Sequence, residues 1–174
     1  MSFLFAATVA AVTLSVPAHA TVTQFIVPLA AAQETSGGQT NGAGTVTLLV
    51  DNVANTITGT PSFNSFVTTP VTGFHIHQGA VGVNGSIVID LVPLLTGGTA
   101  NTTNNPTIAT NITNLLANPT GFYVNAHNAA FPGGAVRGQM AAGVAVVPEA
   151  GTLSLAFGAL SFFGAVVTRR RKAA

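Results

Sequence analysis

The chain has 174 residues, of which 5% are charged, and it contains no cysteine. This length suits one domain with a core of ordinary size, and the lack of cysteine excludes disulfides and thiolate metal sites. Before the basic cluster at 169–172, the body from 21 to 146 has Arg137 as its one basic residue against three acids, a net charge of −2 with neutral histidines. Nucleic acid is therefore a poor candidate as a partner.

Residues 1–20 form an apolar run that ends in Ala18-His19-Ala20. A short apolar stretch followed by a small-x-small tripeptide is typical of a secretory signal peptide and its cleavage site. We therefore predict a signal peptide over 1–20 and export of the protein across the inner membrane. His19 falls within this segment and takes no part in the candidate site.

Strand signals dominate the body, which we predict to be one domain over 21–146. Many β-branched residues and the alternation of apolar with polar residues indicate short strands joined by turns. The expected strands are 21–29, 44–51, 55–59, 71–78, 86–92, 122–127 and 135–142. A short helical turn is expected at 111–117 and an exposed loop at 97–107. About seven to eight short strands without a long amphipathic helix predict an all-β fold, an antiparallel β-sandwich.

The three histidines of the body lie in two short motifs, Gly73-Phe74-His75-Ile76-His77 and Tyr123-Val124-Asn125-Ala126-His127. Alternate side chains of a strand share a face. His75 and His77 are therefore expected on one face, and His127 is expected to share its face with Tyr123 and Asn125. Three imidazoles that meet with an open fourth position can hold Cu or Zn. The alternative is that they are hydrogen-bonded partners at the sandwich edge, which hold the loop 128–134 and Arg137 in place.

Arg137 follows a Gly-Gly turn, in the segment Ala135-Val136-Arg137-Gly138-Gln139. Two roles are open for this single basic side chain. It could face an anionic ligand, or it could form a buried or half-buried structural ion pair with Asp90 or Glu34, because an enclosed charge needs a partner.

The C-terminal segment 147–174 combines Val147-Pro148-Glu149, an uncharged span over 150–168 and the cluster Arg169-Arg170-Arg171-Lys172. As a helix the span reaches about 28 Å, the thickness of a bilayer's hydrocarbon core. We predict a transmembrane helix with the basic cluster on its cytoplasmic side. The three parts in this order resemble the PEP-CTERM sorting signal of Gram-negative bacteria. The resemblance implies that exosortase, a membrane enzyme, cuts near Pro148; an ordinary anchor helix is the alternative.

The two histidine motifs and the segments around them resemble the CHRD domain, which is named for chordin and occurs in many exported bacterial proteins. The ordered set is Gly73–Gly79, Asn84–Leu91, Tyr123–His127 and Phe131–Gln139, and the likeness covers roughly residues 25–142. It implies an extracellular binding or structural module, since CHRD domains have no established catalytic activity.

A second likeness concerns chemistry. The segment Gly73–His77 resembles the strand of Cu/Zn superoxide dismutase that supplies two copper ligands, and His127 could stand for a third. Arg137 lies where that family has an arginine. The histidine that bridges the two metals, the zinc histidines and the cysteine pair are all missing. A two-metal dismutase is effectively excluded, and the sandwich is expected to be superoxide-dismutase-like or immunoglobulin-like.

These observations predict a non-enzymatic protein of the cell envelope or the exopolysaccharide matrix, anchored in the membrane as a precursor before sorting. The expected partners are exosortase and matrix polysaccharides or envelope proteins. No cofactor is expected under this interpretation. The alternative is a mononuclear Cu- or Zn-binding protein that uses His75, His77 and His127. No phosphate-binding loop, serine nucleophile motif or close carboxylate pair points to an enzyme.

Overall fold

The computed structural model describes residues 22–67 and 70–146, so the predicted signal peptide and sorting segment lie outside the described residues. The described part has eight strands, one α-helix and three short 3₁₀ turns. The strands are β1 (Val22–Ala30), β2 (Ala43–Asp51), β3 (Thr56–Phe63), β4 (Val71–Gln78), β5 (Ile87–Asp90), β6 (Phe122–Asn128), β7 (Val136–Gln139) and β8 (Val144–Val146). The helix is α1 (Ile108–Ala117), and the 3₁₀ turns are Ala31–Gln33, Val92–Thr96 and Pro119–Gly121.

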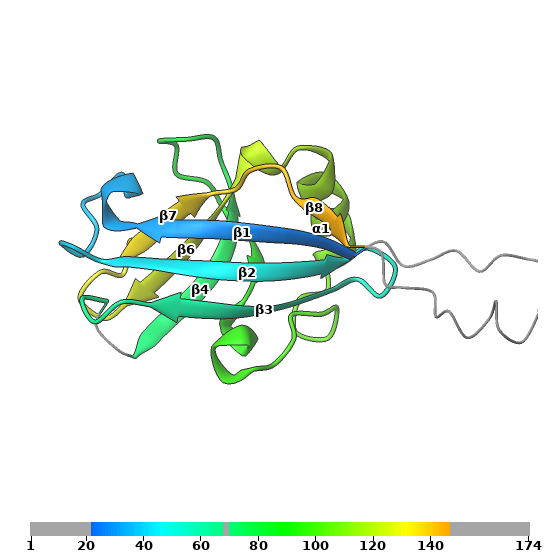
Figure 1. Ribbon diagram of the computed structural model, residues 1–174, viewed down its shortest axis with the longest axis horizontal. Helices are drawn as coiled ribbons and strands as arrows, with labels where there is room; N and C mark the ends of the chain where they lie inside the picture. The colour runs from blue at the N-terminus through cyan, green and yellow to red at the C-terminus, as the bar shows by residue number, and fades with distance from the viewer. Residues whose placement is uncertain (1–21, 68–69, 147–174) are drawn as a thin grey trace, which may run out of the picture.

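All strand pairs are antiparallel and belong to one sheet, in the order β3-β2-β1-β7-β6-β4-β5, with β8 paired to β1. Figure 1 shows β1, β2 and β3 in front, with β4, β6 and β7 crossing behind them. The predicted all-β class and strand number are confirmed, but the sandwich of two separate sheets is not. The sheet curls over itself because β1 and β7 pair at one corner, where Ala30 lies opposite Arg137.

A glycine makes this corner possible. A Cβ on Gly138 would lie 2.3 Å from the Pro28 carbonyl oxygen and 2.8 Å from side-chain carbons of Val27 and Leu29. Any larger residue would push β7 away from β1, because backbone atoms cannot move aside as a flexible side chain can.

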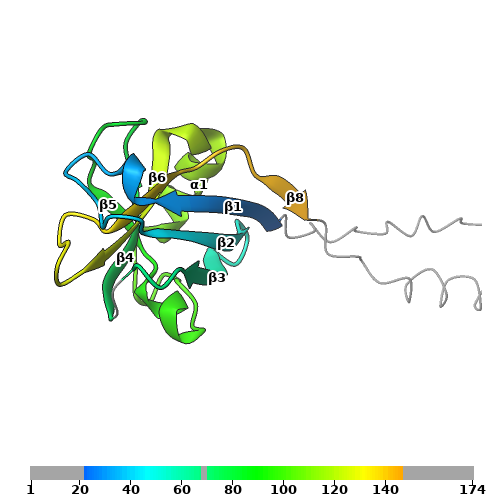
Figure 2. The same ribbon diagram turned by 60° about the vertical axis from the view of Figure 1, so that its left-hand side comes forward.

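The apolar core fills the space inside the curl. Alternate residues of β1 and β2 point inward, as do Phe74 and Ile76 of β4 and Val124 and Ala126 of β6. Ile108, Ile112 and Leu115, on one side of α1, belong to the same core. Figure 2 shows α1 on the side of β6 away from β2 and β3, and β8 running beside β1. The inward half of each strand is thus fully used by packing, which leaves chemistry to the outward half.

Several elements differ from the sequence expectation. β5 ends at Asp90 and β7 at Gln139, and an additional strand, β8, pairs with β1. β3 continues through Pro61 to Phe63, because β3 is an edge strand and an edge tolerates a missing N–H. The loop 97–107 is not wholly exposed, since Ala100 is buried and pairs with Ile57. The helical turn is a full ten-residue helix that begins at Ile108.

Within the described residues, no helix is long and apolar enough to cross a membrane. The predicted transmembrane span at 150–168 lies outside them.

Candidate metal centre

The candidate site lies on the outward face of β4, β6 and β7, where solvent would normally be found. Here loops cover the face. The loop 31–42 reaches β7 through Gln39, whose N–H donates to the Ala135 carbonyl at 2.9 Å. The loop after β4 joins the first loop, because the Thr35 hydroxyl donates to Asn84 Oδ1 at 2.6 Å. On this face His77, Asn125 and Arg137 are therefore buried, and His75 and His127 are half-buried.

Three imidazoles meet under this cover. The ring centroids of His75 and His127 are 5.2 Å apart, those of His77 and His127 5.7 Å, and those of His75 and His77 5.8 Å. The three residues offer ligand nitrogens that all lie within 4.8 Å of one another. Gly73 provides the space, since a Cβ there would lie 2.9 Å from His75 Cε1. The alternation in β4 and the register with β6 thus place all three rings at one point.

Hydrogen bonds fix the orientation of two rings. His77 Nδ1 lies 3.0 Å from the Gly85 carbonyl oxygen, and His127 Nδ1 lies 3.0 Å from the Pro132 carbonyl oxygen. A carbonyl oxygen only accepts, so each Nδ1 carries the proton and each Nε2 carries a lone pair. These two Nε2 atoms and His75 Nδ1 are buried without any hydrogen-bond partner. An imidazole that donates one N–H to the backbone and leaves the other nitrogen free has the arrangement usual for metal ligands.

Burial also keeps the rings neutral. It lowers the pKa of His75 to about 4, with the neighbouring His127 and His77 acting in the same direction and Asp90 opposing. Burial likewise lowers the pKa of His77 and of His127, against the hydrogen bonds that their rings donate to the Gly85 and Pro132 carbonyls, which raise it. Metal ligation needs a deprotonated nitrogen, so all three rings are in the ligand form at neutral pH. The residues present therefore fit one ion bound through three nitrogens at about 2.0–2.1 Å each.

Arg137 lies beside this centre and is only 1% exposed. Its guanidinium carbon stands 3.4 Å from the centroid of the Tyr123 ring. The other face of that ring stacks on His77, with centroids 4.9 Å apart and planes inclined by 9°. A cation over an aromatic face is attracted to it, so the stack of Arg137, Tyr123 and His77 holds the His77 ring in place.

The guanidinium also holds the loop 79–86. Its Nη2 donates to the carbonyls of Ala80 and Val83, both at 3.0 Å. The same loop supplies the Gly85 carbonyl that accepts from His77, and the Gly85 N–H donates to the Tyr123 hydroxyl at 3.1 Å. Arg137 and Tyr123 thus orient His77 twice, through the ring stack and through the loop.

The hydrogen-bond partners of Arg137 are not the carboxylates expected from the sequence. No ion pair joins Arg137 to Asp90 or Glu34 in the described part of the chain, and the guanidinium donates to backbone carbonyls and side-chain amide oxygens instead. Asp90 lies opposite His75 in the sheet and accepts from the Val92 N–H at 2.9 Å. Its negative charge acts on His75.

Glu34, one of the two ion-pair partners expected for Arg137, belongs to the site through other contacts. Its carboxylate packs against Gly134, accepts a hydrogen bond from Asn125 and feels the charge of Arg137. Burial raises its pKa from 4.5 to about 7, and Arg137 and Asn125 only partly oppose this rise. Tyr123 and Gln139 were visible as same-face residues, but their contacts depend on loop positions that strand alternation does not give.

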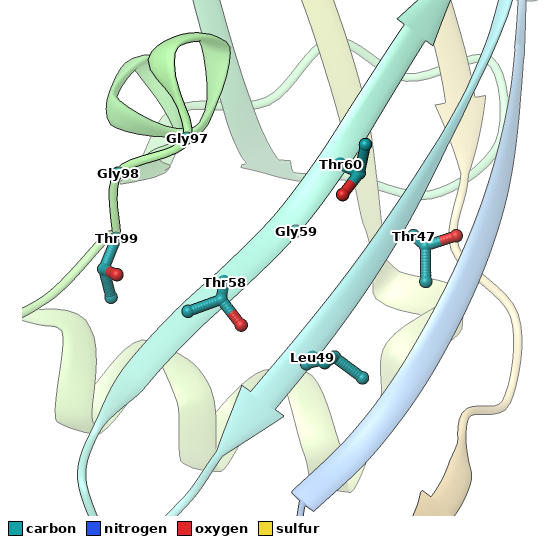
Figure 3. Close-up of a pocket in the computed structure, with 8 residues that line it drawn as sticks. All are labelled: Thr47, Leu49, Thr58, Gly59, Thr60, Gly97, Gly98 and Thr99. Carbon is teal, nitrogen blue, oxygen red and sulfur yellow. The ribbon is translucent and has the colours of Figure 1, made fainter.

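A hollow of about 320 Å³ lies away from the histidines, on the outside of β2 and β3. Figure 3 shows Thr47, Thr58 and Thr60 on the two strands, facing Gly98 and Thr99 across it. The lining has no titratable side chain. It offers hydroxyls for hydrogen bonds and no groups for acid–base or metal chemistry.

A family model described as the CHRD domain matches residues 25–140, a span that includes the three histidines and Arg137. No protein with curated annotation and no solved structure shows a significant match to the chain.

Replacement of Arg137 tests its structural role. We expect Arg137→Ala to lower the free energy of unfolding by about 2–5 kcal/mol, because it leaves a cavity and strands buried carbonyls. The free energy of unfolding of Arg137→Lys should lie between those of Arg137→Ala and the wild type, since lysine keeps the charge but lacks the planar guanidinium group. Urea denaturation measures both. An Arg137→Ala protein within about 0.5 kcal/mol of wild type would contradict this role.

The raised pKa of Glu34 predicts that its contribution to the free energy of unfolding depends on pH. Between pH 4.5 and about 7 the unfolded chain releases a proton that the folded protein keeps. The contribution of this group to stability therefore falls as pH rises through that range. Glu34→Gln removes the titration and keeps an oxygen that can accept from Asn125. Denaturation of both proteins at several pH values should show the variant gaining stability relative to wild type as pH rises; a constant difference is the contrary result.

Proposed function

Because the chain belongs to the CHRD-domain family, we propose that it is an exported, non-enzymatic binding or structural module that holds one copper or zinc ion between His75, His77 and His127. A CHRD domain indicates a secreted module of this class. The geometry of the site supports the bound metal ion. The sequence motifs at the two ends of the chain support the exported location.

The observation that carries the metal proposal is the set of three buried, unpartnered nitrogens, one from each histidine. A structural role alone would leave them hydrogen-bonded, since buried polar atoms almost always have partners. His77 and His127 do hold loops through Nδ1, as the structural alternative requires. Their Nε2 atoms are still free, and together with His75 Nδ1 they suit a single ion.

The proposed location depends on both ends of the chain. The signal peptide over 1–20 would direct export, and Val147-Pro148-Glu149, the apolar span and Arg169–Lys172 would deliver the precursor to exosortase. Cleavage would leave the domain at the cell surface or in the extracellular matrix. A surface with few charges and many Thr, Ser and Asn side chains suits contact with exopolysaccharide. Such side chains form hydrogen bonds with sugars without a strong electrostatic field.

Metal titration of the purified protein tests the centre. We expect one Cu or Zn ion per chain, and His75→Ala and His127→Ala should each weaken binding by about 100-fold or more, because two nitrogens hold a divalent ion poorly. Thr99→Ala, in the threonine-lined hollow, is the matched control and should bind as the wild type does. Metal content by mass spectrometry after equilibrium dialysis gives the result. Unchanged metal in either histidine variant would favour the structural alternative.

Mass spectrometry of the mature protein from an exosortase-bearing host tests the sorting proposal. The expected termini lie just after Ala20 and near Pro148, because both segments beyond them are removed. An extracellular species that retains Arg169–Lys172 would contradict processing by exosortase.

A further inference from the structure

The donor set of the three-histidine centre is uncharged. It consists of imidazole nitrogens alone, and within the described residues no carboxylate and no further histidine joins the group. Two further buried acceptors lack a partner: Asn125 Oδ1, which is neutral, and Oε1 of Glu34, a carboxyl group that bonds to Asn125 and does not belong to the donor set. Zn²⁺ in proteins is almost always four-coordinate, and Cu²⁺ favours tetragonal sites with nitrogen and oxygen ligands. Cu⁺, a closed-shell ion of lower charge, is satisfied by three donors.

The surroundings already hold a positive charge. Arg137 is buried on the far side of the Tyr123 ring from His77 and forms no salt bridge in the described part of the chain. Glu34 interacts with its charge but opposes it only in part near neutral pH, because burial raises the pKa of that carboxyl group to about 7. Repulsion between this guanidinium and a bound ion doubles when the ion's charge goes from one to two, and it is weakly screened because the site is enclosed. Asp90, beside His75, is the carboxylate whose negative charge counters this repulsion at the imidazoles.

The free nitrogens are also closed to solvent. A divalent ion would need a water or an anion to complete its coordination, and that ligand would have to enter the covered face. A monovalent ion with three nitrogens does not need the extra ligand, and it brings half the positive charge into the site.

We infer that the three-histidine centre is selective for monovalent copper over Cu²⁺ and Zn²⁺, an inference that rests on the proposed metal-binding function. It assigns the ion that the exported module would carry, and it gives Arg137 an electrostatic effect on the site besides its structural one.

The test uses the full chain. Cu⁺ affinity is measured without oxygen, with ascorbate as reductant and bicinchoninate as competing chelator, and Cu²⁺ and Zn²⁺ are titrated separately against chelators of known affinity. The dissociation constant for Cu⁺ should be lower than the other two by at least about tenfold, or 1.4 kcal/mol. Bound copper should correspondingly have a reduction potential above that of the aqueous Cu²⁺/Cu⁺ couple. Equal or tighter binding of Zn²⁺ or Cu²⁺ overturns the selectivity and leaves the metal centre standing. No binding of any ion overturns the proposed function itself.

Asp90→Asn tests the electrostatic basis. The asparagine oxygen can still accept from Val92, so the strand end is kept while the charge is lost. Cu²⁺ and Zn²⁺ affinities should fall by a larger factor than Cu⁺ affinity, since a carboxylate attracts a divalent ion twice as strongly. Asp51→Asn is the matched control, because Asp51 also accepts backbone N–H groups, from Val53 and Ala54, and lies on β2. It should change none of the three affinities. An equal loss for all ions in Asp90→Asn overturns the argument from charge.

Discussion

Among the described residues the Arg137 guanidinium is a buried cation with no carboxylate at ion-pair distance, and the covered face of the sheet is organised around it. A buried charge is costly unless hydrogen bonds and polarisable groups replace its hydration. Here two loop carbonyls and the face of Tyr123 do so. The loop 79–86 is thereby held against the sheet, and it presents Gly85 to His77. The orientation of His77 thus depends on how the backbone solvates the Arg137 cation.

The same strands serve two environments. In β4, Phe74 and Ile76 belong to the core, while His75 and His77 lie under the loops on the other side. Since the inward face is packed, the outward face can hold unsatisfied groups without opening the core. The loops that cover this face come from distant parts of the chain and are tied to the sheet and to each other by individual hydrogen bonds. One of these is the hydrogen bond between the Gln139 N–H and Gln33 Oε1.

The strand period was enough to predict from the sequence that His75 and His77 share a face, because it depends on local geometry alone. The approach of His127 to these two rings could also be predicted, because its motif indicates a strand that can lie beside theirs. The partners of Arg137 were not predictable, because the Ala80 and Val83 carbonyls are backbone atoms 57 and 54 positions away and carry no side-chain signal. The single curled sheet was missed for a similar reason. It depends on one long-range pair, Ala30 with Arg137, and no local pattern marks it.

Five buried side-chain atoms lack a hydrogen-bond partner in the described residues: Glu34 Oε1, His75 Nδ1, His77 Nε2, Asn125 Oδ1 and His127 Nε2. Each such atom destabilises a fold by about 1–3 kcal/mol. They are not scattered, since the three imidazoles converge and Asn125 lies between His75 and Arg137 in the sheet while bonding to Glu34. A fold that accumulates this cost in one place, while its core is fully packed, has its stability linked to whatever satisfies those atoms. Any ligand that binds the folded form alone adds to stability in proportion to the logarithm of its concentration over its dissociation constant. The three nitrogens are thus a weakness of the empty fold and the reason that an ion bound there would stabilise it.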